Sequence, residues 1–454
     1  MKEKSSEPSS AGLVIEAGIA KFPSGRSPAE ARAAAEAAYR RAPSGAVHRI
    51  ARGTPLSEVN ALDIAPGDAV LFERGGVWRG QLRVRSGLPG HPVRYGAFGS
   101  GGAPVIQPSL DRGDPADWRE ESGGVWSAAG GSSDIGNVIL DHGDSGCLFR
   151  RERPGELRDD RDYAFDAVAG RVFVRSDAGN PAVRWRSVEF ALKIHAIDEG
   201  FAHDVVYESL SLRYAAAHGI GGSDVARIAV RDCDVAWIGG GYLYVDTLGH
   251  GVRYGNGIEL WGGAEDVVVE GCRAHDCWDA GLTNQSNVPG SEQRNLLWRG
   301  NRVERCEYSY EFWQQGEGGA CENVRLEDND FRDAGGGWGH AQRWNPNAAH
   351  LMLYDTTVPT PGFAVVRNRF ERSRDCLCRA FNDWEGRALF SDNVWVSGGE
   401  PHCRCHARPR TGLRNLYPDH LDQMHRDDAA EIESEGPGGW LRRDRFPWEA
   451  PPRG

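Results

Sequence analysis

One short phrase recurs in this chain between residues 204 and 395. It consists of an Asp or Asn, a run of mostly apolar residues, and then a Cys or Asn that is followed two residues later by an apolar residue. Aligning the copies superimposes six positions, which are Cys233, Cys272, Asn301, Asn329, Asn368 and Asn393. These positions are separated by 39, 29, 28, 39 and 25 residues. A repeat of this size predicts a solenoid or an array of stacked units.

Within each copy, apolar and polar residues alternate with a period of two between Gly, Asn and Asp residues, which predicts short strands. Stacked Asn side chains can hydrogen-bond to the equivalent Asn one strand spacing away. We therefore interpret the six aligned positions as a structural ladder. Asp204, Asp224 and Asp266 each open a copy and are interpreted as turn residues.

Composition excludes several classes of function. The chain has 454 residues and a formal net charge of −12, whereas nucleic acids and anionic membranes select basic surfaces. No apolar run is long enough to span a bilayer. The first twelve residues lack the apolar core of a signal peptide, so the chain is either cytosolic or a mature, trimmed form.

The pattern divides the chain into three parts. Residues 1–59 form an N-terminal segment in which residues 27–42 are Ala-rich, with Ser27 as N-cap and Pro28 at the first helical position. We expect this helix to cover the open first coil. Residues 60–405 form the coil, interrupted by a hairpin-rich excursion at about residues 108–186, and residues 406–454 form a charged tail.

The ten cysteines are too sparse for a disulfide scaffold. Cys277 and Cys306 share a second ladder position, and we expect them to be small buried residues like the cysteines of the first ladder. The two C-x-C pairs near the end of the coil could instead hold a structural Zn²⁺ or close as disulfides, although their spacing is not that of common zinc sites. These pairs are Cys376 with Cys378 and Cys403 with Cys405.

With these repeats, the chain resembles the right-handed parallel β-helix superfamily, which includes pectate lyases, polygalacturonases and other bacterial polysaccharide-degrading enzymes. The resemblance covers roughly residues 60 to 400 and implies an all-β, right-handed parallel β-helix. It also implies a polysaccharide or oligosaccharide partner bound along one sheet face, and an extracellular or periplasmic location. The superfamily contains hydrolases, lyases, epimerases and non-catalytic adhesins, so no catalytic residue is carried over.

A strand precedes the ladder phrase in each coil, and four such strands lie at residues 256–263, 280–287, 308–315 and 350–355. Alternation places one set of side chains inside the coil, namely Ile258, Leu260, Leu282, Phe312, Leu351 and Leu353. It places the other set outside, namely Glu259, Trp261, Thr283, Gln285, Glu311, Trp313, Met352 and Tyr354.

Glu259 and Glu311 share one register two coils apart, with Thr283 between them. Two strand spacings separate the backbones by roughly 9.5 Å. Inverting glycosidases hold their two carboxyl groups about 6.5–9.5 Å apart, and retaining ones about 5–5.5 Å apart. The pair therefore predicts an inverting glycoside hydrolase that requires no cofactor. The alternative is that each Glu forms a structural ion pair with an Arg.

Trp261 and Trp313 also share a register two coils apart, and they either offer flat platforms for sugar rings or lie covered by loops. We expect the remaining substrate contacts to come from four further residues, which are Gln285, His340, Arg343 and Tyr354.

Two other functions remain open. A lyase or epimerase acting on a uronic-acid glycan would need a base and a cation, which Lys193 and His195 could supply with help from the loop around His340. A non-catalytic glycan-binding β-helix is the second alternative. Asp246 and Asp279 are candidates for a second acid or for a Ca²⁺ ligand.

Overall fold

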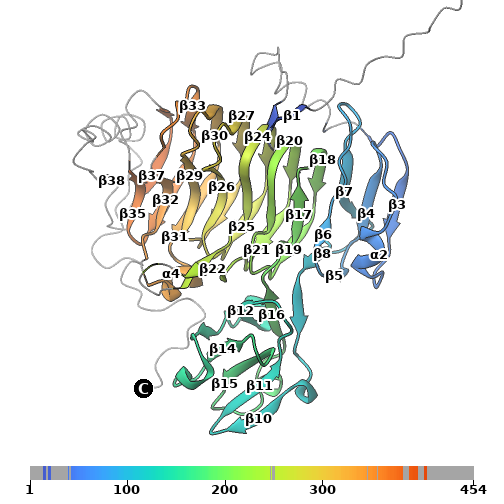
Figure 1. Ribbon diagram of the computed structural model, residues 1–454, viewed down its shortest axis with the longest axis vertical. Helices are drawn as coiled ribbons and strands as arrows, with labels where there is room; N and C mark the ends of the chain where they lie inside the picture. The colour runs from blue at the N-terminus through green and yellow to red at the C-terminus, as the bar shows by residue number, and fades with distance from the viewer. Residues whose placement is uncertain are drawn as a thin grey trace, which may run out of the picture.

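The computed structural model describes residues 14–16, 19–21, 39, 42–245, 247, 251–344, 346–354, 356–381, 388–396 and 403–405. It is a right-handed parallel β-helix, as the repeat predicts (Figure 1). Each coil passes through three strands on three faces, and each face is a column of parallel strands. Within the described part of the chain, no helix is long and apolar enough to cross a membrane.

The first face carries the strands that we predicted ahead of the ladder phrase. It consists of β6 (Leu82–Arg83), β17 (Ile197–Gly200), the first part of β20 (Ile220–Arg231), the first part of β24 (Ile258–Glu270), β26 (Ala280–Ser286), β29 (Tyr308–Gln314), β32 (Ala349–Leu353), β35 (Cys376–Ala380) and β38 (Cys403–Cys405).

The apolar runs of the repeat form the second face. It consists of β3 (Val47–Ile50), β4 (Ala69–Glu73), β7 (Val93–Phe98), β18 (His203–Glu208), the second parts of β20 and β24, β27 (Glu292–Arg299), β30 (Ala320–Glu327), β33 (Phe363–Val366) and β36 (Ala388–Ser391).

The residues after each ladder position form the third face. It consists of β5 (Val77–Arg79), β8 (Val105–Gln107), β19 (Ser211–Arg213), β21 (Asp234–Ala236), β25 (Arg273–His275), β28 (Arg302–Glu304), β31 (Asp330–Ala334), β34 (Arg369–Ser373) and β37 (Val394–Val396).

The ladder lies at the turn between the second and third faces, and its six residues are buried. The side-chain oxygen of Asn329 accepts hydrogen bonds from the backbone and the side chain of Asn301, at 2.9 and 3.1 Å. Asn368 accepts the equivalent bonds from Asn329 at 3.0 and 2.8 Å. The residue before each ladder position has a positive φ, for example 56° at Asp328, which Asp and Gly tolerate best.

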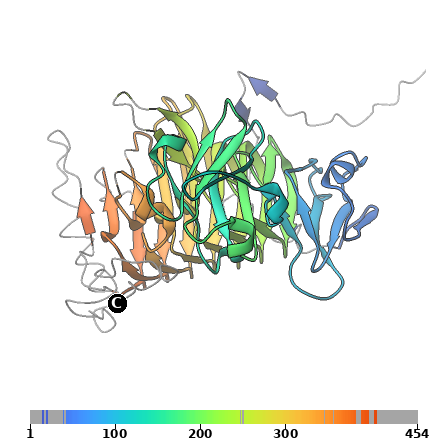
Figure 2. The ribbon, with the colours of Figure 1, turned by 90° about the horizontal axis from the view of Figure 1, so that it is seen from below.

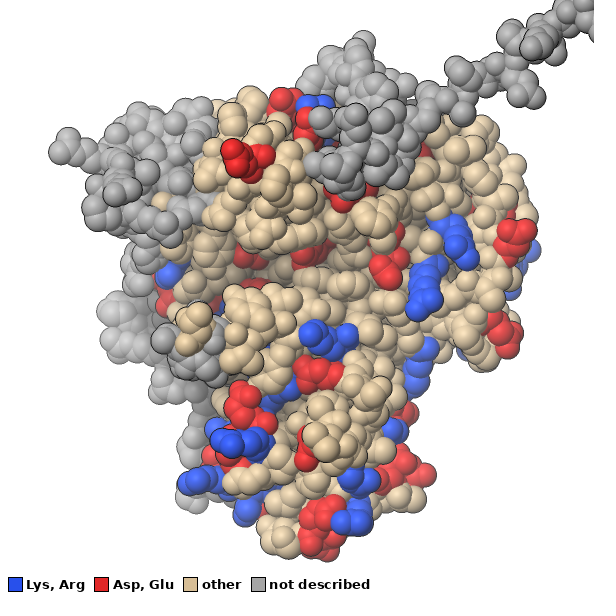
Figure 3. All heavy atoms as spheres, viewed as in Figure 1, with Lys and Arg blue, Asp and Glu red and all other residues tan. Residues whose placement is uncertain are grey.

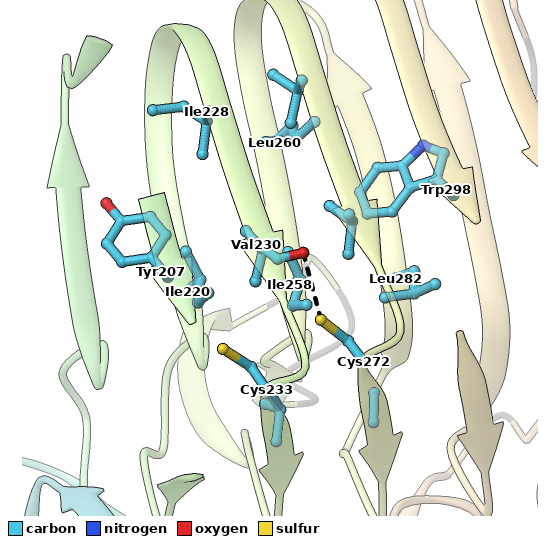
Figure 4. Packing of buried hydrophobic residues seen from close by; sticks show 14 of the residues in the cluster. Tyr207, Ile220, Ile228, Val230, Cys233, Ile258, Leu260, Cys272, Leu282 and Trp298 are labelled. Atoms are coloured by element: carbon cyan, nitrogen blue, oxygen red, sulfur yellow. Dashed lines mark hydrogen bonds between the residues drawn. The ribbon is translucent and has the colours of Figure 1, made fainter. Parts of the chain in front are cut away.

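The interior of the coil is one continuous apolar cluster (Figure 4). All six side chains predicted to face inward belong to it, together with Cys277 and Cys306. The Sγ of Cys272 points to the backbone oxygen of Val230 at 3.5 Å, so this ladder cysteine uses a neighbouring carbonyl in place of an Asn partner. The prediction that these cysteines are small buried residues is confirmed.

The N-terminal end differs from our expectation. The coil begins at β3, before residue 60, and the short helix α2 (Leu56–Asn60) inserts Leu56 and Val59 into the core of the first coils. Most of the predicted capping helix lies outside the described residues. Its residue Tyr39 packs against the outer side of the second face beside Val206, not on the open first coil, and its hydroxyl donates to the Asp266 backbone oxygen at 3.0 Å.

The excursion lies to one side of the coil (Figures 1 and 2). It has a three-stranded sheet of β9 (Ser109–Asp111), β16 (Val188–Leu192) and β12 (Ile135–Leu140). A five-stranded sheet follows, made of β10 (Arg119–Ser122), β11 (Val125–Ala129), β15 (Arg171–Arg175), β14 (Asp162–Asp166) and β13 (Phe149–Arg150). The two sheets share an apolar cluster that is separate from the core of the coil.

At the C-terminal end, Cys376 and Cys378 are buried, and β35 pairs with β38 so that Cys378 lies opposite Cys403. The described residues contain no group of three or more His, Cys, Asp or Glu side chains placed to hold a metal ion. The side chains of Cys403 and Cys405 and the predicted tail at residues 406–454 lie outside the described part.

Candidate functional site

A cleft runs across the first face, between its outward side chains and two covering elements. These are the hairpin of β22 (Gly241–Val245) and β23 (Gly251–Tyr254), and the short helix α4 (Trp338–Gln342). It has two hollows, of about 730 and 630 Å³, which share Tyr244, Asp279, Glu311 and Trp313. Carboxylate side chains are visible deep in a recess on this side of the molecule (Figure 3).

The register predicted for the two glutamates is confirmed. Glu259 on β24 pairs with Thr283 on β26, which pairs with Glu311 on β29. The two glutamates are 6% and 7% exposed, and both line the larger hollow. Their backbones are therefore two strand spacings apart, roughly 9.5 Å.

Among the described residues, neither glutamate forms the structural ion pair with an Arg that was the alternative. Glu259 lies beside His218, whose Nδ1 is 2.6 Å from Oε2, and the same oxygen accepts a hydrogen bond from Asn256 Nδ2 at 2.8 Å. Burial by itself would raise the pKa of Glu259, but the charge and hydrogen bonds of these neighbours outweigh it and the pKa is lowered. Both contacts fall on Oε2, so Oε1 is the oxygen available to a water molecule.

Glu311 has the opposite environment. Burial, and then the carboxylates of Asp279 and Glu259, raise its pKa well above the ordinary value. Its Oε2 accepts a hydrogen bond from Gln285 Nε2 at 2.7 Å, and Trp313 Nε1 donates to the Oε1 of the same amide at 2.9 Å. This second bond fixes the orientation of Gln285, because only its NH₂ group is left to face the carboxyl.

The two tryptophans meet across the strand that separates them. Trp261, Gln285 and Trp313 are paired in register, and the indole rings contact edge to face with their centroids 5.7 Å apart. Both rings are half-buried and line the cleft, so they are neither fully covered by loops nor separate flat platforms. They form one aromatic corner beside the glutamate row.

Two other predicted site residues line the smaller hollow of the cleft. Tyr354 lines the smaller hollow, and its hydroxyl lies 3.2 Å from that of Tyr308. Arg343 lines the same hollow but is bound to Asp279 at 2.8 Å and to the Trp278 backbone oxygen at 2.6 Å.

His340 does not belong to the set of described residues that line the two hollows, because its Nδ1 is 3.0 Å from the buried carboxylate of Glu307. Its ring is thus engaged by Glu307. Met352 is fully buried in a small cluster with Tyr308 and Cys376, so its predicted outer position is covered.

The two residues of the alternative lyase site have different surroundings. His195 lines the larger hollow, where burial lowers its pKa to about 4, and its Nδ1 accepts a hydrogen bond from the His218 backbone at 3.1 Å. Lys193 contacts the ring face of Tyr254 at 5.7 Å and is not among the residues that line either hollow.

Sequence reasoning missed His218 and Asn256, the two neighbours of Glu259. They lie in connections that lead into the first-face strands. The repeat requires no particular residue type in these connections. Asp279, predicted only as a candidate for a second acid or a Ca²⁺ ligand, lines both hollows, and burial raises its pKa. Asp246 lies outside the described residues.

A third hollow, of about 740 Å³, lies apart from the cleft between α2 and the third face. Its Arg79 binds Glu189 through two hydrogen bonds of 2.7 and 2.8 Å, and its Arg213 pairs with Asp234. No residue predicted for the site lies there.

No protein-family model matches this chain, and no curated protein matches it in sequence. Solved structures match in fold. A chain described as a glycoside hydrolase matches with a TM-score of 0.44 and 10% identity over 80% of this chain and 95% of that one. A structure described as XylC in complex with xylose has a TM-score of 0.44 and 9% identity over 86% and 82% of the two chains.

An alginate lyase from Paenibacillus sp. matches with a TM-score of 0.39 and 9% identity over 80% of this chain and 99% of that one. The fold of the chain itself is the parallel β-helix that its repeat predicts.

Proposed function

We propose that this protein is a glycoside hydrolase that cleaves a polysaccharide or oligosaccharide with inversion at the anomeric carbon. The observation that carries the proposal is the pair Glu259 and Glu311 in one cleft, two strand spacings apart, with pKa values moved in opposite directions. Two carboxyl groups with opposed pKa values are the requirement for one base and one acid in the same site.

Glu311 is the general acid in this proposal. Its raised pKa keeps it protonated near neutral pH, so that it can give a proton to the oxygen of the departing sugar. Gln285 donates to Oε2, which suits an oxygen that carries no proton. The acidic proton is then held by Oε1.

Glu259 is the general base. Its lowered pKa keeps it ionised, and His218 and Asn256 hold Oε2. Oε1 takes the proton of a water that attacks the anomeric carbon from the face opposite the leaving group. A backbone separation of roughly 9.5 Å leaves room for that water between the carboxyl group and the sugar.

The aromatic corner of Trp261 and Trp313 holds a sugar ring by its apolar face, and Tyr244 of the hairpin faces the same space from the opposite wall. Trp313 thus has two roles, since it also orients Gln285 toward the acid.

The test is the release of reducing ends from a panel of polysaccharides by Glu311→Gln and Glu259→Gln variants. We expect each variant to lose at least about a hundredfold in kcat, with circular dichroism unchanged. Glu120→Gln, at an exposed position of the excursion, is the matched control and should keep full activity.

Fresh product examined by proton NMR before mutarotation should carry the anomeric configuration opposite to that of the substrate. Retention of configuration would contradict the assigned roles. Products that absorb in the ultraviolet because of a new C=C bond would show that the reaction is elimination by a lyase.

A further inference from the structure

The charged groups of the cleft are mostly acidic. Four carboxyl groups line the larger hollow, which are those of Asp198, Glu259, Asp279 and Glu311. No Lys or Arg is among the described residues that line this hollow. The recess with acidic atoms in Figure 3 lies on the same side of the molecule.

The two arginines of the smaller hollow are already engaged. Arg343 is paired with Asp279 and hydrogen-bonded to a backbone carbonyl. Arg253 donates to the backbone oxygens of Gly240 and Gly136 at 2.7 and 2.8 Å and to Gln342 at 2.9 Å. Its guanidinium also covers the Trp278 ring at 3.8 Å. The charge of Arg343 is thus already balanced by a carboxylate, and Arg253 is held by backbone carbonyls and the Trp278 ring.

His195 adds no positive charge to the larger hollow. Burial and the neighbouring His218 lower the pKa of His195 to about 4, so its ring is neutral at pH 7. A uronate carboxylate or a sulfate in this hollow would therefore face the carboxylates of Asp198 and Glu259, with no Lys or Arg among the described residues that line it. It would also raise the pKa of Glu259, so that less of the proposed base is ionised.

We infer that the cleft accepts a glycan without acidic groups, and that an amine-bearing glycan binds it more tightly than the N-acetylated form of the same glycan. The inference rests on the proposed function for the position of the sugar, but its test is a binding measurement that needs no turnover. Uronic-acid glycans, which were the substrates of the alternative lyase, are excluded by the same charges.

The experiment is affinity electrophoresis of the Glu311→Gln variant, which binds without cleavage, through gels that contain neutral, aminated or acidic polysaccharides. The amine arm compares chitosan with soluble glycol chitin, and the acid arm compares polygalacturonate with its methyl ester. We expect retention by neutral or aminated glycans only. Retention by an acidic polysaccharide, or by no member of the panel, would overturn the inference.

A variant that lacks one carboxylate provides a second test, because the affinities of the same variant for two glycans are compared. Asp198→Asn removes one carboxylate at the edge of the cleft, and we expect affinity for the aminated glycan to fall about fivefold while that for a neutral glycan is unchanged. Asp63→Asn, at an exposed site on another part of the coil, is the control and should change neither. Equal losses for both glycans in Asp198→Asn would contradict the charge argument.

The two proposals fail in different ways. Binding of neutral or aminated glycans without release of reducing ends by the native protein would refute the hydrolase and leave the charge preference intact. Release of reducing ends from polygalacturonate by the native protein would refute the charge preference and leave the hydrolase intact.

Discussion

Glu199 is a buried acid in the core of the coil, and replacing it should make stability less dependent on pH. It lies on β17, next to Asp198 of the cleft, but its own side chain is 3% exposed. Space for it exists because the next coil carries Gly222, whose added Cβ would lie 2.5 Å from the Cβ of Glu199. Burial raises the pKa of Glu199 to about 7 from 4.5.

The sign of the effect follows from this raised pKa. Below about pH 4.5 the group is protonated in both the folded and the unfolded chain, so its ionisation does not change the free energy of unfolding. As the pH rises through 7 the folded chain must lose the proton in an apolar setting, so stability falls. A difference of about 2.5 pKa units corresponds to about 3 kcal/mol of unfolding free energy at pH 8.

Glu199→Gln, which mimics the neutral acid, should therefore unfold at the same urea concentration as the native protein at pH 4.5. At pH 8 it should be about 3 kcal/mol more stable. Glu58→Gln, on the exposed side of α2, should show no such divergence. If Glu199→Gln changes the free energy of unfolding equally at both pH values, the carboxyl is not held neutral by burial and the reasoning is wrong.

Three further predictions concern the ladder and the cleft. Asn329→Ala leaves the Asn301 amide and a buried backbone carbonyl without partners, so urea unfolding should show a loss of about 2–6 kcal/mol. Asp279→Asn removes a negative charge beside Glu311 and lowers its pKa. The alkaline limb of the kcat/KM profile should then move toward lower pH by about one unit. Trp261→Ala should raise KM about three- to tenfold with kcat nearly unchanged in initial-rate measurements.

The sequence was most informative where the coil requires a particular residue. The turn between the second and third faces is buried, so the backbone N–H groups of the neighbouring coil need a hydrogen-bond acceptor there. The side chains of Asn301, Asn329 and Asn368 accept these hydrogen bonds. Counting alternate residues back from this ladder assigned the outward positions correctly, including those of Glu259 and Glu311. The fold and the two-coil spacing could therefore be read without coordinates.

The sequence was least informative where segments leave the coil. His340 was predicted to contact the substrate and Met352 to face outward, but whether a position on a sheet is open depends on what folds over it. Met352 is covered by neighbouring aromatic rings. His340 pairs with Glu307, an acidic residue to which the repeat assigned no role. Tertiary contacts of this kind have no period along the chain, so the repeat cannot predict them.

The connections between coils also give the two glutamates the different environments on which the proposed acid and base roles rest. The strand register makes Glu259 and Glu311 equivalent, since both occupy the same outward column. Their difference comes from outside that column, because His218 and Asn256 approach the first and Asp279 approaches the second. Exchanging these neighbours, and not the glutamates, is the change that should reverse the two roles, since register sets the spacing of the pair and the connecting segments set its protonation.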